Sequence, residues 1–302
     1  MKTPTAEVLR GAGGFQQLEL AVRIKLDGLL HGENLTRQYG PGSERGESRS
    51  YQPGDDARRI DWSVTARMNE LYVRDTIADR ELETWLVVDG SASLDFGTAD
   101  WEKRDLAITA AGAFSLLGTK PGDRTGSIVF DAEGEHMSPP RGGRQPVLHL
   151  LRRLEQRPRQ DAGRASLASA LKLTNRVAKR RGRIVIIADL LDTDDWAREL
   201  RYLRSRHEVI VAHVVDPREW SLPPVGLVTF VDPETGETFE VQTSSRSTRR
   251  RFAAASAERL SELEERVMSS GAQYVRLSTD SDWLLDLVAF VVRSRRLGVP
   301  AA

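Results

Sequence analysis

The sequence predicts an α/β protein built on a doubly wound, mostly parallel sheet. Apolar runs of strand length alternate with amphipathic segments of helix length along most of the chain, which places helices on both faces of a sheet. Two of these runs, 183–189 and 208–215, are almost purely apolar, as is typical of strands buried on both faces. A chain of 302 residues is also long enough to bury the large core that this architecture requires.

The individual elements follow from hydrophobic spacing and turn residues. Near the start of the chain we expect a helix over 7–30, a Gly- and Ser-rich loop over 31–56 and a short strand over 70–75. Strands are predicted over 83–89, 183–189, 208–215 and 273–277. Helices are predicted over 101–117, 146–154, 166–179, 196–205, 252–269 and 281–294. Hairpins are predicted over 124–138 and 225–241.

These elements group into four segments. Residues 1–80 are expected to form an N-terminal helix with a loop and strand, and residues 81–220 the α/β core. Residues 221–270 form a hairpin and helix insertion, and residues 271–302 add the last strand and helix of the core. The core is thus expected to be interrupted once.

Composition limits the classes of function. Lys and Arg together number 44, as do Asp and Glu, so no net charge attracts the chain to nucleic acid or to an anionic membrane. Cys is absent, which excludes disulfides, thiolate metal sites and cysteine nucleophiles. No signal peptide or membrane-spanning run is evident, so we expect a soluble, cytoplasmic protein.

Carboxylates and hydroxyls follow two of the predicted strands. Asp89, Ser91 and Ser93 come at the end of the first strand, and Asp189 ends the strand over 183–189. Ligands of open α/β sheets bind beyond the carboxyl ends of the strands. Carboxylate and hydroxyl oxygens are ligands that Mg²⁺ accepts. The pattern therefore predicts a divalent-cation site, for which Mg²⁺ is the expected cofactor.

A plainer interpretation of the same residues stays open. Ser91 and Ser93 are residue types that cap the following helix, and Asp189 is of a type that closes its own loop. Both interpretations place these side chains at the same edge of the sheet.

Two stretches resemble known families. Residues 87–93, Val-Val-Asp-Gly-Ser-Ala-Ser, resemble the metal-ion-dependent adhesion site of von Willebrand A domains, a Rossmann-like fold. Residues 49–62, with 66–67 and 71–74, are similar to the signature of the bacterial family of domain of unknown function 58. The resemblance extends from about Leu29 to Arg296 and implies a von Willebrand A-like fold.

The resemblance also implies a ligand set. Asp89, Ser91, Ser93 and Asp189 would be the metal positions. Adhesion sites usually add a Thr from a middle loop, whereas this chain has Ala165 there, and only the neighbouring Ser166 offers a hydroxyl. Ser166 is therefore the fifth candidate ligand.

The resemblance implies a partner class and no reaction. Members of the family are often encoded beside MoxR-type AAA+ ATPases and are thought to act with them as chaperone-like assembly factors. We therefore expect a non-enzymatic adaptor that binds such an ATPase or its client, with Asp192 beside the strand-end site as a candidate contact. Many relatives carry N-terminal membrane helices, and we expect a cytosolic form here.

The segment 53–62 combines acids, arginines and an aromatic residue. Asp55, Arg58, Arg59 and Trp62 are candidate partner contacts, because Arg and Trp are favoured anchors of interfaces. The sequence favours an alternative: an internal strut in which Asp55 or Asp61 pairs with an arginine and Trp62 fills a core pocket.

Two further functions stay open as alternatives. Residues 152–183 carry eleven cationic residues against two acids, which is compatible with nucleic-acid binding, but no aromatic residues are interleaved. Asp89 and Asp189 are compatible with a metal-dependent phosphoester hydrolase. None of the five His residues sits in a recognisable catalytic motif, so no enzyme activity is expected.

Overall fold

The chain divides into two compact units. The computed structural model describes residues 13–31, 48–52, 55–68, 70–74, 82–118, 122–159, 165–192, 194–231 and 236–296. One unit comprises residues 1–33 and 82–302, and the other comprises residues 34–81. The N-terminal helix thus belongs to the larger unit, whereas the sequence analysis grouped it with the segment that follows.

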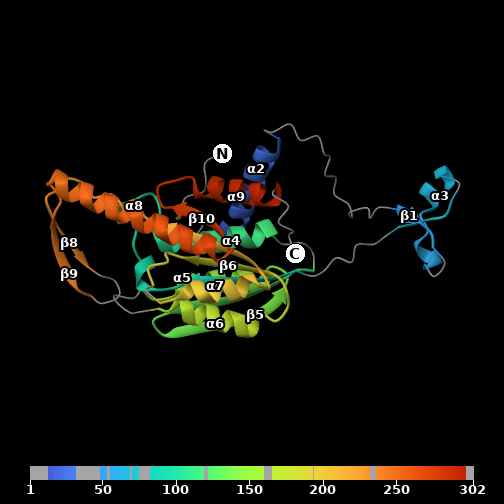
Figure 1. Cartoon of the computed structure of the whole chain (residues 1–302), viewed down its shortest axis with the longest axis horizontal. Helices are drawn as coiled ribbons and strands as arrows, with labels where there is room; N and C mark the ends of the chain where they lie inside the picture. Colours follow the sequence, from blue (N-terminus) through green and yellow to red (C-terminus); the bar gives the residue numbers. More distant parts are fainter. Residues whose placement is uncertain are drawn as a thin grey trace. The chain divides into compact units, whose positions relative to one another are not determined.

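The larger unit is built on a six-stranded sheet (Figure 1). Its strands are β3 (Glu83–Asp89), β4 (Arg124–Asp131), β5 (Gly134–Gly142), β6 (Arg183–Ala188), β7 (Glu208–Val215) and β10 (Gln273–Ser278). Their order is β10-β7-β6-β3-β4-β5, and every neighbouring pair is parallel except β4 and β5. The chain winds outward from β3 in both directions, which confirms the predicted doubly wound sheet.

Helices cover both faces of this sheet, as Figure 1 shows. One core lies under α2 (Gly14–His31), α4 (Lys103–Gly118), α5 (Gln145–Gln156) and α9 (Trp283–Arg296). The other lies under α6 (Leu167–Val177), α7 (Trp196–Arg204) and α8 (Arg246–Ser269). Successive side chains of β3 alternate between the two cores, because strand residues point to opposite faces. A strand with two buried faces must be apolar throughout, which explains the unbroken apolar runs.

The hairpin after β7 lies outside the main sheet. Strands β8 (Leu227–Val231) and β9 (Thr238–Gln242) pair with each other in a separate two-stranded sheet. The next helix, α8, begins at Arg246, six residues before the predicted start, because the hydroxyl of Ser245 accepts a hydrogen bond from the Thr248 amide and caps it. None of the described helices has the length and apolarity needed to cross a bilayer.

Within its described residues, the smaller unit has a two-stranded sheet, a 3₁₀ turn and a short α-helix. Strand β1 (Ser48–Ser50) pairs with β2 (Tyr72–Arg74), and η1 (Ala57–Arg59) and α3 (Trp62–Met68) lie between them in sequence. The sequence analysis expected a loop over the whole of 31–56, so it missed β1. The Ser-Arg-Ser text has no apolar alternation, and the strand is defined only by its pairing with β2.

Gly182, directly before β6, tests the packing of the sheet. A Cβ at this position would lie 2.0 Å from the carbonyl oxygen of Glu83, so Gly182→Ala must push β6 away from β3. We expect a loss of about 1–3 kcal/mol in the free energy of unfolding, measured by urea denaturation. Gly142→Ala is the control, because its nearest atom lies at 3.8 Å. Equal losses in the two variants would contradict this account.

Candidate functional site

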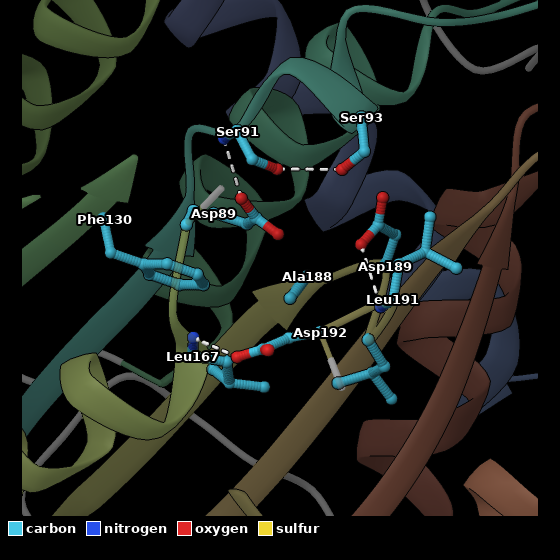
Figure 2. A pocket seen from close by; sticks show the side chains of 11 residues that line it. Asp89, Ser91, Ser93, Phe130, Leu167, Ala188, Asp189, Leu191 and Asp192 are labelled. Carbon is cyan, nitrogen blue, oxygen red and sulfur yellow. Dashed lines mark hydrogen bonds between the residues drawn. The ribbon is translucent and has the colours of Figure 1, made fainter. Parts of the chain in front are cut away.

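Two neighbouring parallel strands bring the candidate residues to one edge of the sheet. Asp89 is the last residue of β3 and Asp189 follows β6 directly; within these strands Val88 pairs with Ile187. Figure 2 shows the two carboxylates facing a common space. The small pocket there has a volume of about 10 Å³, which is about the least that can hold one water molecule. It is lined by Asp89, Ser91, Ser93, Phe130, Ala165, Leu167, Ala188, Asp189, Leu190, Leu191 and Asp192.

The loop after β3 turns its polar atoms inward. The amide of Ser91 donates a hydrogen bond of 2.8 Å to Oδ1 of Asp89, and the hydroxyls of Ser91 and Ser93 lie 2.8 Å apart (Figure 2). Ser91 precedes a short 3₁₀ turn, η2 (Ala92–Leu94), but its side chain makes no capping bond there. Its hydroxyl faces its neighbour in the pocket, so the plain capping interpretation is wrong for Ser91.

The second carboxylate has two different partners. Oδ1 of Asp189 accepts a bond of 3.2 Å from the Leu191 amide, as the loop-closing interpretation expected. Oδ2 lies 2.9 Å from Nζ of Lys103, the first residue of α4. The same ammonium lies 2.6 Å from Oε1 of Glu219 and is 1% exposed.

Sequence reasoning missed Lys103. One signal was present: a lysine at the first position of a helix opposes the positive end of the helix dipole, so it needs a specific acidic partner. The identity of that partner was not accessible, because Asp189 lies 86 residues away and Glu219 lies 116 residues away along the chain.

The Lys103 ammonium gives the carboxyl groups of Asp89 and Asp189 different pKa values. Burial, then the negative charge of Asp189, raises the pKa of Asp89 to about 7. Burial also acts to raise the pKa of Asp189, but the charge of Lys103 and hydrogen bonds from Ser93, Lys103 and the Leu191 amide hold it below its usual value. Burial acts to lower the pKa of Lys103, and its two carboxylate partners outweigh that effect and raise it. Asp189 and Lys103 are therefore a charged pair, and Asp89 is the group that titrates near neutrality.

A polar network holds the lysine's second partner in place. Oε2 of Glu219 accepts a bond of 2.9 Å from the amide of Asp216, in the turn η3 (Pro217–Glu219) that follows β7. The Asp216 carboxylate accepts bonds from the amide and hydroxyl of Thr98 and from the hydroxyl of Thr279. The network thereby joins the ends of β7 and β10 to the loop before α4.

His213 supports the Asp189 loop from the other side. Its Nε2 lies 2.9 Å from the Asp189 carbonyl oxygen and its Nδ1 lies 2.8 Å from the Tyr274 hydroxyl. Burial lowers the pKa of this imidazole to about 4, so it is neutral at physiological pH.

The middle loop departs from the expected ligand set. Ser166 does not line the pocket: its hydroxyl accepts from the Ser169 amide as the N-cap of α6 and donates to Asp194 at 2.9 Å. Ser166 is thus set apart from the other four candidate ligands. Ala165 lines the pocket without a polar side chain. Asp192 also lines it, and its Oδ2 accepts the Leu167 amide at 2.8 Å, which fastens the middle loop to the end of β6.

In the smaller unit, the acids of the 53–62 segment shape the backbone. Oδ2 of Asp55 accepts from the Gln52 amide, Asp56 caps η1 by accepting the Arg58 amide, and Asp61 accepts the amide and hydroxyl of Ser63. Trp62 is 68% exposed. The interpretation in which Trp62 fills a core pocket is therefore wrong within this unit, because the aromatic ring lies at its surface.

The family assignment rests on a family model that matches most of the chain. A family model described as "Protein of unknown function DUF58" matches residues 47–262. The chain belongs to the DUF58 family. The match includes the 49–62 signature and all the described residues of the strand-end site.

DUF58 relatives and solved structures give the following likenesses. The chain is 48% identical over 286 residues to the uncharacterized protein Rv1480 of Mycobacterium tuberculosis, covering 94% of this chain and 90% of that protein. It is similar to an aerotolerance-related membrane protein from Bacteroides fragilis, with a TM-score of 0.47 and 16% identity over 70% of this chain and 99% of that one. It is also similar to the SpRpn10 VWA domain, with a TM-score of 0.41 and 13% identity over 69% of this chain and 94% of that one.

The DUF58 pocket offers oxygen donors that suit a hard divalent cation. Asp89, Ser91 and Ser93 provide a carboxylate and two hydroxyls around a space of the size of one small ion. Within the described ranges, no group of three or more His, Cys, Asp or Glu side chains is placed to hold a metal ion. Any ion held here would therefore depend on the serine hydroxyls.

The basic stretch 152–183 is partly neutralised within the DUF58 fold. Arg157 pairs with Asp95 at 3.0 Å, Arg159 with Glu102 at 2.6 Å, and Arg183 with Glu208 at 2.9 Å. At least three of the cationic side chains that the structure describes in this stretch are thus in ion pairs, which reduces the positive charge available to bind nucleic acid.

Replacing the buried lysine tests its importance to the fold. Lys103→Met leaves Asp189 and Glu219 without their cation, so we expect a loss of about 3–5 kcal/mol in the free energy of unfolding. The control is Lys25→Met, whose partner Asp282 is 42% exposed and where we expect about 1 kcal/mol or less. Chemical denaturation of both variants measures the difference, and a Lys103 loss no larger than that of Lys25 would refute the account.

Asp216 predicts a component of acid sensitivity. Burial acts to raise its pKa, but the bonds from Thr98, Arg218 and Thr279 hold it below the usual value. Its contribution to stability is therefore complete above about pH 4 and is lost as the pH falls through the lowered folded-state pKa. Asp216→Asn should be less stable at pH 7, and its free energy of unfolding should fall less steeply below pH 4 than that of the wild type. Urea denaturation across this range measures the slopes, and equal slopes would count against the role of Asp216.

Proposed function

We propose that the chain is a non-enzymatic protein-binding adaptor or assembly factor that works through the pocket at the ends of β3 and β6. The observation that carries this proposal is the convergence of two carboxylates and two hydroxyls in one place on the loop edge of the sheet. Sites at this edge can vary with their loops while the strands beneath stay fixed. A rigid sheet that presents a few polar atoms suits recognition of another protein.

The size of the pocket sets how a partner can reach it. A space of about 10 Å³ admits one ion or one water molecule and no side chain. Contact with a partner therefore runs through one small bridging group. The volume of the pocket is also far below the roughly 300–1,000 Å³ that is typical of sites for small molecules. This difference supports a non-enzymatic role over that of a phosphoester hydrolase.

Mg²⁺ is the bridging group that we propose. Asp89, Ser91 and Ser93 would hold it, and Asp189 would stand beside it with its charge balanced by Lys103. The ion would supply the positive charge with which an acidic side chain of the partner can pair. Asp192, at the rim of the same pocket, is a candidate for direct contact with the partner.

The partner we propose is a MoxR-type AAA+ ATPase or its client, in the cytoplasm. Membership of the DUF58 family supports this choice, because that is the partner class the family resemblance implies. In the smaller unit, Asp55, Arg58, Arg59 and Trp62 are proposed as additional contacts. The exposed indole of Trp62 supports this, because tryptophan and arginine dominate the binding energy of many interfaces.

Removing the charge of Asp89 tests the proposal. Immobilised wild type and Asp89→Asn would be compared for binding to the purified MoxR-type ATPase of the same organism in Mg²⁺ buffer. We expect binding to weaken by about ten-fold or more, because the ion loses its charged ligand while the side-chain shape is kept. Glu258→Gln, at an exposed position of α8, is the matched control.

The two halves of the proposal can fail separately. Unchanged binding by a folded Asp89→Asn, checked by circular dichroism, would rule out the pocket as the docking site. An absence of binding by the wild type would rule out this class of partner.

A further inference from the structure

We propose that Lys103 is a built-in cation that takes over part of the role of the divalent ion, so that the isolated chain binds Mg²⁺ or Mn²⁺ only weakly. The proposal deepens the proposed function, since it concerns the same pocket and rests on it. It follows from where the ammonium lies and how firmly it is held.

The ammonium already engages one of the two carboxylates that face the pocket. Nζ of Lys103 lies 2.9 Å from Oδ2 of Asp189, while the other oxygen, Oδ1, accepts the Leu191 amide. Both oxygens of this carboxylate are therefore engaged within the chain. A divalent ion that approached Asp189 would have to displace a buried ion pair and would meet the positive charge of the ammonium.

Lys103 is also fixed at both ends. Its backbone amide donates to the carbonyl oxygen of Phe96 at 2.8 Å, at the start of α4. Its ammonium bonds to Glu219 at 2.6 Å, and Glu219 is itself held by the Asp216 amide. With 1% of its side chain exposed, the lysine is almost completely buried while it makes these bonds. It is a permanent part of the pocket's charge.

The middle loop at Ala165 and Ser166 gives a second, independent reason to expect weak metal binding. Ala165 lines the pocket with a methyl group, and the neighbouring hydroxyl of Ser166 is directed to Asp194. The ion would thus have three close side-chain donors, Asp89, Ser91 and Ser93, and water or a partner's carboxylate would have to complete its shell. The pocket thus has one hydroxyl donor fewer than a site with a Thr at position 165, and it contains the positive charge of Lys103. Both features weaken metal binding by the chain alone.

The test titrates Mn²⁺ into the purified full chain, followed by the electron paramagnetic resonance signal of free Mn²⁺ and by the melting temperature. Lys103→Gln keeps a hydrogen-bond donor and removes the charge. We expect it to bind Mn²⁺ about ten-fold or more tightly than the wild type, with a matching Mn²⁺-dependent rise in melting temperature. The double variant Lys103→Gln/Asp89→Asn should lose most of this gain, because only one of the two carboxylates that face the pocket is then left to attract the ion.

A second lysine serves as the control. Lys25→Gln removes a positive charge from an ion pair whose partner, Asp282, is 42% exposed, and should leave Mn²⁺ affinity at the wild-type value. Micromolar binding of Mn²⁺ by the wild type, or equal affinity of Lys103→Gln and wild type, would overturn the proposal. Should Lys103→Gln fail to fold in buffer, refolding in Mn²⁺ decides: recovery supports the proposal, and no recovery overturns it.

This outcome is separable from that of the proposed function. If Lys103→Gln gains no Mn²⁺ affinity while Asp89→Asn still loses the partner, the role given to Lys103 fails and the docking pocket stands. If Lys103→Gln gains affinity while Asp89→Asn binds the partner normally, the built-in cation stands and the docking pocket fails.

Discussion

A carboxylate at the buried end of a parallel strand has to be neutralised, and here the ammonium of Lys103 does so for Asp189. The distance of 2.9 Å and the near-complete burial of both side chains make this pair the interaction on which the site depends. Without it, two carboxylates would face each other across the ends of β3 and β6, and only one of them could stay ionised at neutral pH. With it, Asp189 remains charged, and Asp89, whose pKa is raised to about 7, is the carboxyl group that changes charge near neutral pH.

The same pair ties the site to the rest of the fold. Lys103 begins α4, Asp189 directly follows β6, and Glu219 belongs to the turn after β7. The polar atoms of the pocket are thus positioned by three elements of the core rather than by one flexible loop. A site supported in this way keeps its geometry when the surrounding surface varies, which suits a platform for recognition.

The sequence was sufficient for the architecture and for placing four candidate ligands at one edge of the sheet. Continuous apolar runs gave the central strands, because a strand buried on both faces leaves no room for polar residues. Asp89, Ser91, Ser93 and Asp189 were placed at one edge because parallel strands end together. No local pattern links a lysine at a helix start to a glutamate in a 3₁₀ turn, so the cation at the centre of the site came only from the structure.

The other differences have equally specific causes. Strand β1 has no hydrophobic alternation and is recognisable only by its pairing with β2. Ser166 was expected at the pocket because it neighbours the position of a missing hydroxyl, but a residue next to that position points elsewhere, here to Asp194. Trp62 was assigned to a core on the strength of its residue type, although its unit of 48 residues, 34–81, leaves the indole at the surface.

The turn η3 is only three residues long, yet it carries one of the two acceptors of the Lys103 ammonium. The position of this 3₁₀ turn is fixed by Asp216, whose carboxylate accepts hydrogen bonds from the hydroxyls of Thr98 and Thr279. Any event that lifts this turn would leave the ammonium with a single carboxylate and increase its hold on Asp189. The charge balance at the end of β6 therefore depends on a segment that is not among the residues lining the pocket, and a shift of this short turn would change the electrostatic environment of Asp189.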